Sequence, residues 1–124
     1  KELSESYPSN VGFKNGLAIS YQYLGNTQSS LGNLEQALQF FEKYNSLERE
    51  LYEAYPSNVG FKNGLAVSYL YLGQTEEKLN NIANAKKYYL QGQKLYQELV
   101  KDFPTYHNFR QNLQWVENHL KTLA

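Results

Sequence analysis

The sequence predicts an all-α fold, an α-solenoid of about five antiparallel helices plus a partial N-terminal turn. Three observations predict it. The twelve residues YPSNVGFKNGLA occur at 7–18 and again, unchanged, at 55–66. Apolar residues recur at helical spacings, and no stretch alternates apolar and polar residues for long enough to form a strand. A fixed period of 20–50 residues indicates stacked repeats, because one unit alone cannot bury its apolar face.

The repeat extends beyond this segment and sets the domain organisation. Residues 7–27 match 55–75 with three differences, and residues 103–113 carry the pattern a third time. Residues 1–6 resemble 49–54, the end of a second helix. We therefore expect one domain, 1–124, cut from a longer array. Its expected parts are 1–6, the end of a preceding helix; 7–54, the first repeat; 55–102, the second; and 103–124, a partial third repeat or capping helix.

Each repeat is predicted to contain two helices. The first begins after Tyr-Pro-Ser-Asn, where Pro8 ends whatever precedes it and Ser9 or Asn10 can cap the helix. Leu-Gly-Asn at 31–33 ends that helix, and Asn33 can cap the next. The predicted core stripes are Phe13, Leu17, Tyr21, Leu24 and Leu31 on the first helix, and Leu34, Ala37, Leu38, Phe41, Tyr44, Leu51 and Tyr55 on the second. In the second repeat they are Phe61, Leu65, Tyr69, Leu72 and Leu79, then Ile82, Ala85, Tyr89, Leu95, Leu99 and Phe103.

The composition disfavours several classes of partner. Twelve basic residues balance twelve acidic ones, so the basic excess that nucleic acids and anionic membranes attract is missing. No apolar run approaches the ~20 residues of a membrane span. The sequence contains no Cys, which excludes disulfides and Cys-based zinc sites. The cytoplasm is the default location.

The residues that recur in both units resemble the tetratricopeptide repeat (TPR) in type and spacing. Tyr21, Leu24, Gly25, Ala37 and Phe41 have that family's spacing, and so do Tyr69, Leu72, Gly73, Ala85 and Tyr89. The period of 48 exceeds the family's usual value of about 34, which indicates a long-helix variant. The resemblance implies a right-handed superhelix that acts as a non-catalytic scaffold and binds a peptide or protein segment in a concave groove lined by the first helices.

We expect the groove on the face of the first helices that is turned away from the core stripe. Amide side chains suit a peptide backbone because each supplies both a donor and an acceptor. The alternative is that these positions are ordinary solvated residues that repeat only because the unit was duplicated. The candidates are Asn15, Ile19, Gln22, Asn26 and Ser29 in the first unit, Asn63, Val67, Leu70, Gln74 and Glu77 in the second, and Gln111 and Trp115 in the third.

Three cations recur at the same period, Lys14, Lys62 and Arg110. They could attract an acidic peptide at the groove rim, or lay their stems over apolar neighbours and pair with nearby acids. Trp115, the single Trp, could anchor a partner or close the end of the array.

No catalytic constellation is recognisable. His107 and His119 lie too far apart on one helix to share a metal, and the Gly-x3-Gly segments lack the Lys-Ser/Thr of a nucleotide loop. We therefore expect no enzymatic activity, cofactor or metal. The expected partner is a protein or peptide, with neither nucleic acid nor membrane. The alternative function is a structural module that self-associates through the ends of its array.

Overall fold

Five helices follow one another in the computed structural model, which describes the backbone of residues 2–123 and the side chains of residues 10–123. The described residues contain no strand, which confirms the all-α prediction. The helices are α1 (Glu2–Ser30), α2 (Leu34–Ala54), α3 (Val59–Lys78), α4 (Ile82–Asp102) and α5 (His107–Leu123).

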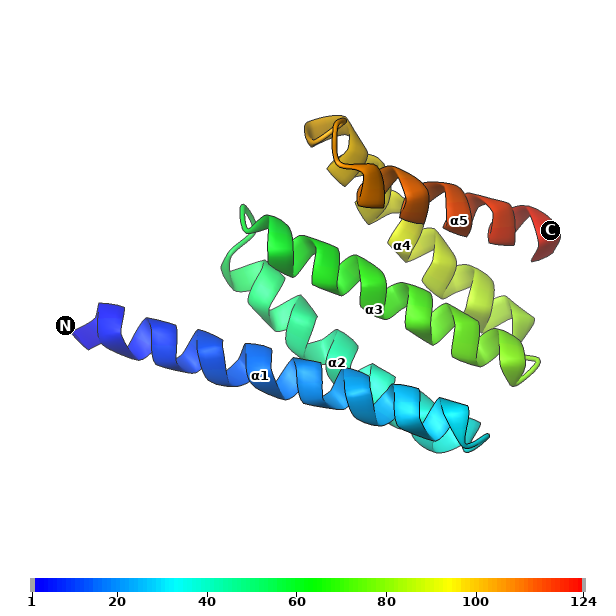
Figure 1. The fold of residues 1–124 in the computed structure, drawn as a ribbon, viewed down its shortest axis with the longest axis horizontal. Coiled ribbons are helices and arrows are strands. Elements are labelled where there is room, and N and C mark those ends of the chain that lie inside the picture. The colour runs from blue at the N-terminus through cyan, green and yellow to red at the C-terminus, as the bar shows by residue number, and fades with distance from the viewer. Residues whose placement is uncertain (1, 124) are drawn as a thin grey trace.

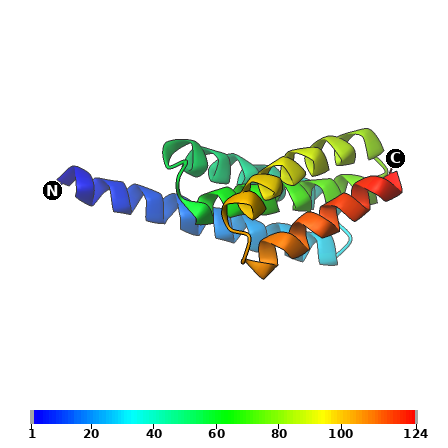
Figure 2. The same cartoon turned by 90° about the horizontal axis from the view of Figure 1, so that it is seen from above.

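The helices form two layers, with α1, α3 and α5 in one and α2 and α4 in the other (Figures 1 and 2). Consecutive helices run antiparallel (Figure 1). The closely packed pairs are α1 with α2, α2 with α3, α3 with α4 and α4 with α5. Each second helix is therefore held between two first helices, and the first helices face a common side.

Small residues allow the two helices of a repeat to approach each other. A methyl group at Gly25 would overlap the ring of Phe41, and one at Gly73 would overlap the ring of Tyr89. Both rings are buried, as are Ala37 and Ala85. The glycines thus give up helix propensity so that a large ring can fill the space between the paired helices.

The turns inside the two repeats are built alike. Gly32 and Asn80 both have a positive φ, 84° and 66°, and end their helices. Asn33 and Asn81 precede the next helices, but their side chains do not cap them. Instead Asn33 Nδ2 donates to Gln28 Oε1 at 2.8 Å and Asn81 Nδ2 donates to Glu76 Oε1 at 3.0 Å. The predicted turn positions are confirmed, and the capping role of the Asn33 side chain is wrong.

The predicted start of the first helix is also wrong. Helix α1 runs without a break through the residues that we expected to end one helix and cap the next, so residues 2–6 belong to α1. Asn10 lies inside the helix, and Ser9 lies outside the described side chains. In the second repeat the same four residues, Tyr-Pro-Ser-Asn at 55–58, form a turn. There Asn58 Oδ1 caps α3 by accepting a hydrogen bond from the Phe61 N–H at 3.0 Å. The turn folds α3 back onto α2, whereas the described residues contain no helix before α1.

The predicted core stripe of the first helix is buried at its centre in α3, whereas in α1 its members are half-buried or exposed. Leu65 and Leu72 are 5% and 1% exposed. By contrast, Phe13 is 71% exposed, Leu24 43% and Leu31 67%. The difference follows from neighbours. In α3 this face is covered by the preceding helix α2, whereas in α1 Tyr21 packs on Phe40 of α2 and no helix precedes α1 among the described residues.

Candidate functional site

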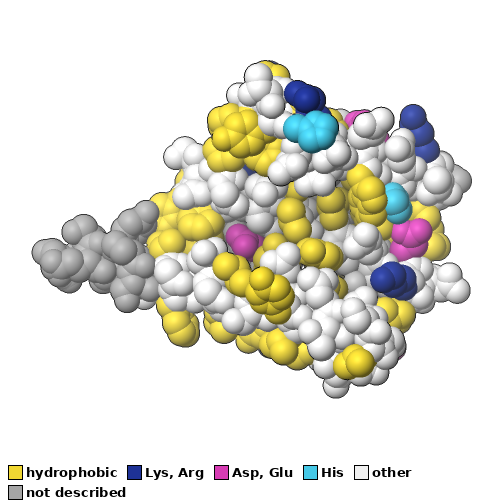
Figure 3. Space-filling model, viewed as in Figure 1, with side chains coloured by type: hydrophobic (Ala, Val, Ile, Leu, Met, Phe, Trp, Pro, Cys, Tyr) yellow, Lys and Arg dark blue, Asp and Glu magenta, His cyan; other side chains and the backbone are white. Residues whose placement is uncertain are grey.

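An open pocket of about 300 Å³ lies between α3 and α5. It opens on the side of the molecule that the first helices share, where hydrophobic side chains gather between α3 and α5 (Figure 3). Its lining combines apolar walls with two amide side chains. The lining residues are Val67, Leu70, Tyr71 and Gln74 from α3, and Asn112 and Trp115 from α5.

Helical spacing places these side chains on one face of each helix. The four residues of α3 stand at positions i, i+3, i+4 and i+7, which project from a single side of a helix. The two residues of α5 are three apart and share a face for the same reason. Because α3 and α5 are not among the closely packed pairs of helices, their side chains leave the space between them partly open.

The aromatic wall of the pocket is held by its neighbours. The Trp115 ring meets the edge of Tyr89 with centroids 5.8 Å apart, and it stacks on His119 at 3.7 Å. Leu70 packs closely against Gly92 of α4, where an added methyl group would overlap the Leu70 side chain. The walls are therefore formed before any ligand arrives.

A chain of hydrogen bonds positions Asn112. Its Nδ2 donates to the Tyr96 hydroxyl at 3.0 Å, and this hydroxyl donates to Asn63 Oδ1 at 2.9 Å. Burial raises the pKa of Tyr96 above its ordinary value, so the phenol keeps the proton that it donates. Among the described residues, no hydrogen bond uses Asn112 Oδ1 or the Gln74 amide, and both remain available to a ligand.

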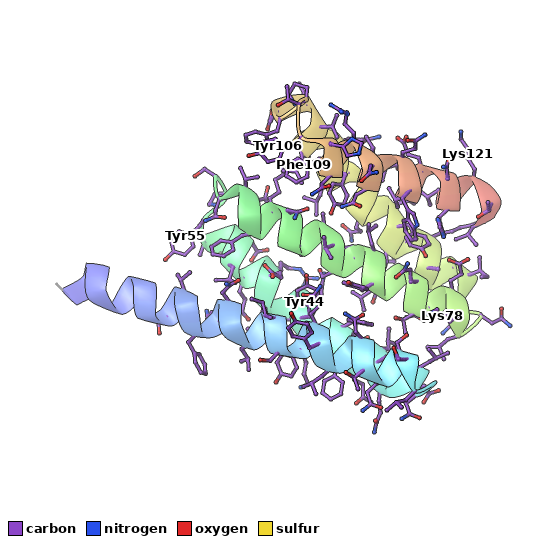
Figure 4. The ribbon with its side chains drawn as sticks, in the orientation of Figure 1. Tyr44, Tyr55, Lys78, Tyr106, Phe109 and Lys121 are labelled. Carbon is purple, nitrogen blue, oxygen red and sulfur yellow. The ribbon has the colours of Figure 1, made fainter. Side chains whose placement is uncertain are left out.

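One end of the pocket is charged. Gln74, Glu77, Lys78 and His119 line a second open pocket that shares Gln74 with the first, and Lys78 lies at the C-terminal end of α3 (Figure 4). Glu77 Oε1 accepts a hydrogen bond from the Tyr89 hydroxyl at 2.8 Å. This bond ties the charged end to the same aromatic cluster that holds Trp115.

The pocket contains some of the groove residues expected from the sequence. Val67, Leu70, Gln74 and Trp115 line it, while Gln111 and Glu77 each line a neighbouring open pocket. Tyr71 and Asn112 line the pocket but were not among the groove candidates expected from the sequence. The spacing of Tyr71, four residues after Val67 and three before Gln74, could have identified it. Asn112 had no such signal, because its counterparts at the same repeat position are Gly16 and Gly64.

The remaining groove candidates lie elsewhere. Asn63 turns toward α4, where it accepts the bond from Tyr96. Two of the α1 candidates connect α1 to α3: Gln22 Nε2 donates to the Tyr71 hydroxyl at 3.4 Å, and Ser29 Oγ accepts from Lys78 Nζ at 3.5 Å. The five α1 candidates, none of which lines the pocket between α3 and α5, are Asn15, Ile19, Gln22, Asn26 and Ser29.

The repeated cations turn toward the second helices. Lys14 Nζ lies 3.2 Å from Glu50 Oε1, and Lys62 Nζ lies 2.7 Å from Glu98 Oε1. Burial lowers the pKa of Lys62, but the bond to Glu98 and the negative charges of Glu98, Tyr52 and Asp102 together outweigh burial, so this pKa is raised overall. Arg110 donates to the Pro104 carbonyl. These bonds hold Lys14 and Lys62 against the second helix of their own pair, away from the pocket.

Two further properties of the described residues bear on chemistry. Between residues 10 and 123, no group of three or more His, Cys, Asp or Glu side chains is placed to hold a metal ion. None of the helices in the described part of the chain combines the length and apolar character that crossing a bilayer requires.

Two segments of the chain match a family model described as the tetratricopeptide repeat, residues 18–51 and 66–99. Each segment begins within a first helix and ends within the following second helix. Together they cover more than half of the 124 residues. Residues 52–65, between the matches, extend the end of α2 and the start of α3 beyond the family's unit. No curated protein and no solved structure matches the chain.

Proposed function

The chain belongs to the tetratricopeptide repeat family, whose repeats mediate protein–protein interactions, and from this premise we propose that it holds one segment of a partner protein in the pocket between α3 and α5. The proposed role is that of a non-catalytic scaffold. The partner supplies an extended or helical segment, and the chain supplies a preformed surface to receive it.

The observation that carries this proposal is the combination of apolar walls with free amides. A pocket of about 300 Å³ accommodates a large apolar side chain. The Val67, Leu70 and Trp115 side chains would remove that side chain from water. The Gln74 amide and Asn112 Oδ1 are used by no hydrogen bond among the described residues, and they would bond to the backbone beside the inserted side chain.

Rigidity of the pocket favours binding. The stack of Trp115 on His119 and the bond from Asn112 to Tyr96 fix two lining residues in the free protein. Binding therefore costs less side-chain entropy than it would on a mobile surface. At one end, Glu77 and Lys78 lie beside the pocket, so polar or charged residues are expected next to the apolar anchor of the ligand.

A library of random peptides displayed on phage tests the proposal directly. We expect selection on the immobilised chain to enrich peptides with a large apolar residue, and their affinity to fall at least about tenfold in Gln74→Arg and Trp115→Ala. The matched control is Gln39→Arg, which changes an exposed Gln on α2 and should leave the affinity unchanged.

Selected peptides whose affinity is the same in the wild type, Gln74→Arg and Trp115→Ala would overturn the proposal. A circular dichroism spectrum and a thermal unfolding curve for each variant would separate loss of the site from loss of the fold.

A further inference from the structure

One side of α1 exposes an apolar stripe that has no partner among the described residues. We define the outer face of α1 as Phe13, Leu17, Ser20, Tyr23 and Leu24, together with Leu31 just after the helix. Phe13 is 71% exposed, Tyr23 68% and Leu24 43%. Hydrophobic side chains lie along this lower edge of the molecule in Figure 3. Most of the large exposed apolar residues of the described chain belong to this face.

The same face exists on α3, where α2 covers it. The residues 48 positions later are Phe61, Leu65, Ser68, Tyr71, Leu72 and Leu79. Leu65, Ser68 and Leu72 are buried. The Tyr71 ring stacks on Phe41 of α2 with centroids 4.9 Å apart, and Asn45 Nδ2 of α2 donates to Ser68 Oγ at 2.8 Å.

The third copy of the face, on α5, is covered by α4. Phe109 and Val116 are buried, and the Phe109 ring lies 6.3 Å from that of Tyr96 of α4. Leu113 and Leu120 pack against the same clusters. In two of the three first helices, this face therefore receives the second helix that precedes it.

Details of the outer face of α1 match α3 and differ from α5. Where α2 packs on α3, the carboxyl group of Glu48 presses on Gly64 and Asn45 bonds to Ser68. Helix α1 has Gly16 and Ser20 at these two positions, with nothing within 4 Å of a methyl group placed on Gly16. Helix α5 instead has Asn112 and Val116. A Gly inside a helix costs about 1 kcal/mol, and at Gly16 no described contact uses the space that it leaves.

We propose that the outer face of α1 binds an amphipathic helix of a partner protein that carries the seating pattern of α2. The pattern has a small residue at position i, an aromatic residue at i+4, Asn at i+8, Glu at i+11 and Leu at i+14. In α2 these are Ala37, Phe41, Asn45, Glu48 and Leu51, all of which are buried, and Phe41, Asn45 and Glu48 contact α3 directly. The aromatic ring would stack on Tyr23, the Asn would donate to Ser20, and the Glu would lie over Gly16.

A second copy of this chain does not supply such a helix. Its α2 is already held between α1 and α3, and its α4 between α3 and α5. The outward positions of α5 that correspond to buried Ala66 and Tyr69 of α3 are Gln114 and Glu117. The helices of a second copy that carry the apolar pattern are therefore already occupied.

A synthetic peptide of residues 33–56, labelled with a fluorophore, is the direct probe. We expect saturable binding to the full chain by fluorescence anisotropy, and a loss of affinity of at least about tenfold in Leu24→Glu, which places a charge on the face. The matched control is Leu90→Glu, because Leu90 is a comparably exposed leucine on α4, 53% against 43%. This control should bind as the wild type does.

A second probe tests the specificity. The peptide of residues 81–103, which carries the α4 pattern and packs against Val116 in the chain, should bind more weakly than the α2 peptide. Ser20→Val should reverse this preference. Variants that lose helical circular dichroism would be replaced by Leu24→Gln, which keeps the side chain polar but neutral.

Absence of binding by the α2 peptide, or equal losses in Leu24→Glu and Leu90→Glu, would overturn the proposal. A concentration-dependent dimer in light scattering that Leu24→Glu dissociates, without peptide binding, would overturn it in favour of a second copy. Because the outer face of α1 and the pocket between α3 and α5 share no residue, the proposal stands or falls independently of the proposed function.

Discussion

Glu48 on α2 lies against the backbone of Gly64 on α3, so closely that a methyl group on Gly64 would overlap the carboxyl group. Glu48 is 5% exposed, and its Oε1 has no hydrogen-bond partner among the described residues. Burial raises the pKa of Glu48 to about 7. In the next repeat Tyr96 takes this position and Asn112 faces it, and there the polar groups are paired. The interface between α2 and α3 therefore contains a buried carboxyl group that is neutral at low pH.

The buried Glu48 predicts that the chain becomes less stable as the pH rises. The pKa of Glu48 is 4.5 in the unfolded chain and about 7 in the folded chain. Between these two pH values, Glu48 binds a proton in the folded chain that it has lost in the unfolded chain. The stabilisation is complete below pH 4.5 and is lost as the pH passes through about 7. We expect the free energy of unfolding to fall by about 1–3 kcal/mol across this window. Urea unfolding followed by circular dichroism measures it.

The variant Glu48→Gln isolates this effect, because it removes the titrating group and keeps the shape. Its free energy of unfolding should fall less than that of the wild type over the same pH range. Glu53→Gln, at an exposed position of the same helix, should keep the wild-type dependence. Parallel curves for the wild type and Glu48→Gln would show that Glu48 is not the group responsible.

Gly16 and Gly64 stand at equivalent positions of the two repeats, and we expect their replacement by Ala to change the free energy of unfolding in opposite directions. Gly16→Ala gains helix propensity in open space and should raise the free energy of unfolding by about 0.5–1 kcal/mol. Gly64→Ala forces a methyl group onto Glu48 and should lower it by about 1–3 kcal/mol. Chemical denaturation of the two variants under one condition provides the comparison. Changes of the same sign would contradict the packing of Glu48 on Gly64.

The buried bond between Asn45 and Ser68 predicts strong coupling between α2 and α3. Asn45 Nδ2 donates to Ser68 Oγ at 2.8 Å, and Asn45 Oδ1 accepts from Arg49 at 2.6 Å. Asn45→Ala and Ser68→Ala each leave a buried group unpaired, and each should cost about 1–3 kcal/mol of stability. The double variant should cost less than their sum, by about 1 kcal/mol. Asn84→Ala, at an exposed position of α4, should change the stability by less than about 0.5 kcal/mol.

Much of the candidate site could be predicted from the sequence, because helical spacing is local information. Val67, Leu70 and Gln74 stand at i, i+3 and i+7 and had to share a face of any helix that contained them. Asn112 could not be found this way, since its importance depends on the bond to Tyr96, which lies 16 positions away in the chain and on another helix. For the same reason the sequence left open whether Lys62 faces a ligand or Glu98.

The sequence by itself determined the helices, their order and their family, since composition, spacing and the 48-residue repeat act within or between short segments. The tertiary structure decided what each identical segment does. Phe13 and Phe61 sit in the same twelve residues, yet Phe13 is 71% exposed while Phe61 is half-buried beside the ring of Tyr55. Pro8 lies within a helix and Pro56 lies in a turn. The local sequence sets the helix propensity of a segment, but burial depends on the helix that packs against it. Helix α2 packs against this face of α3, whereas the described residues contain no helix before α1.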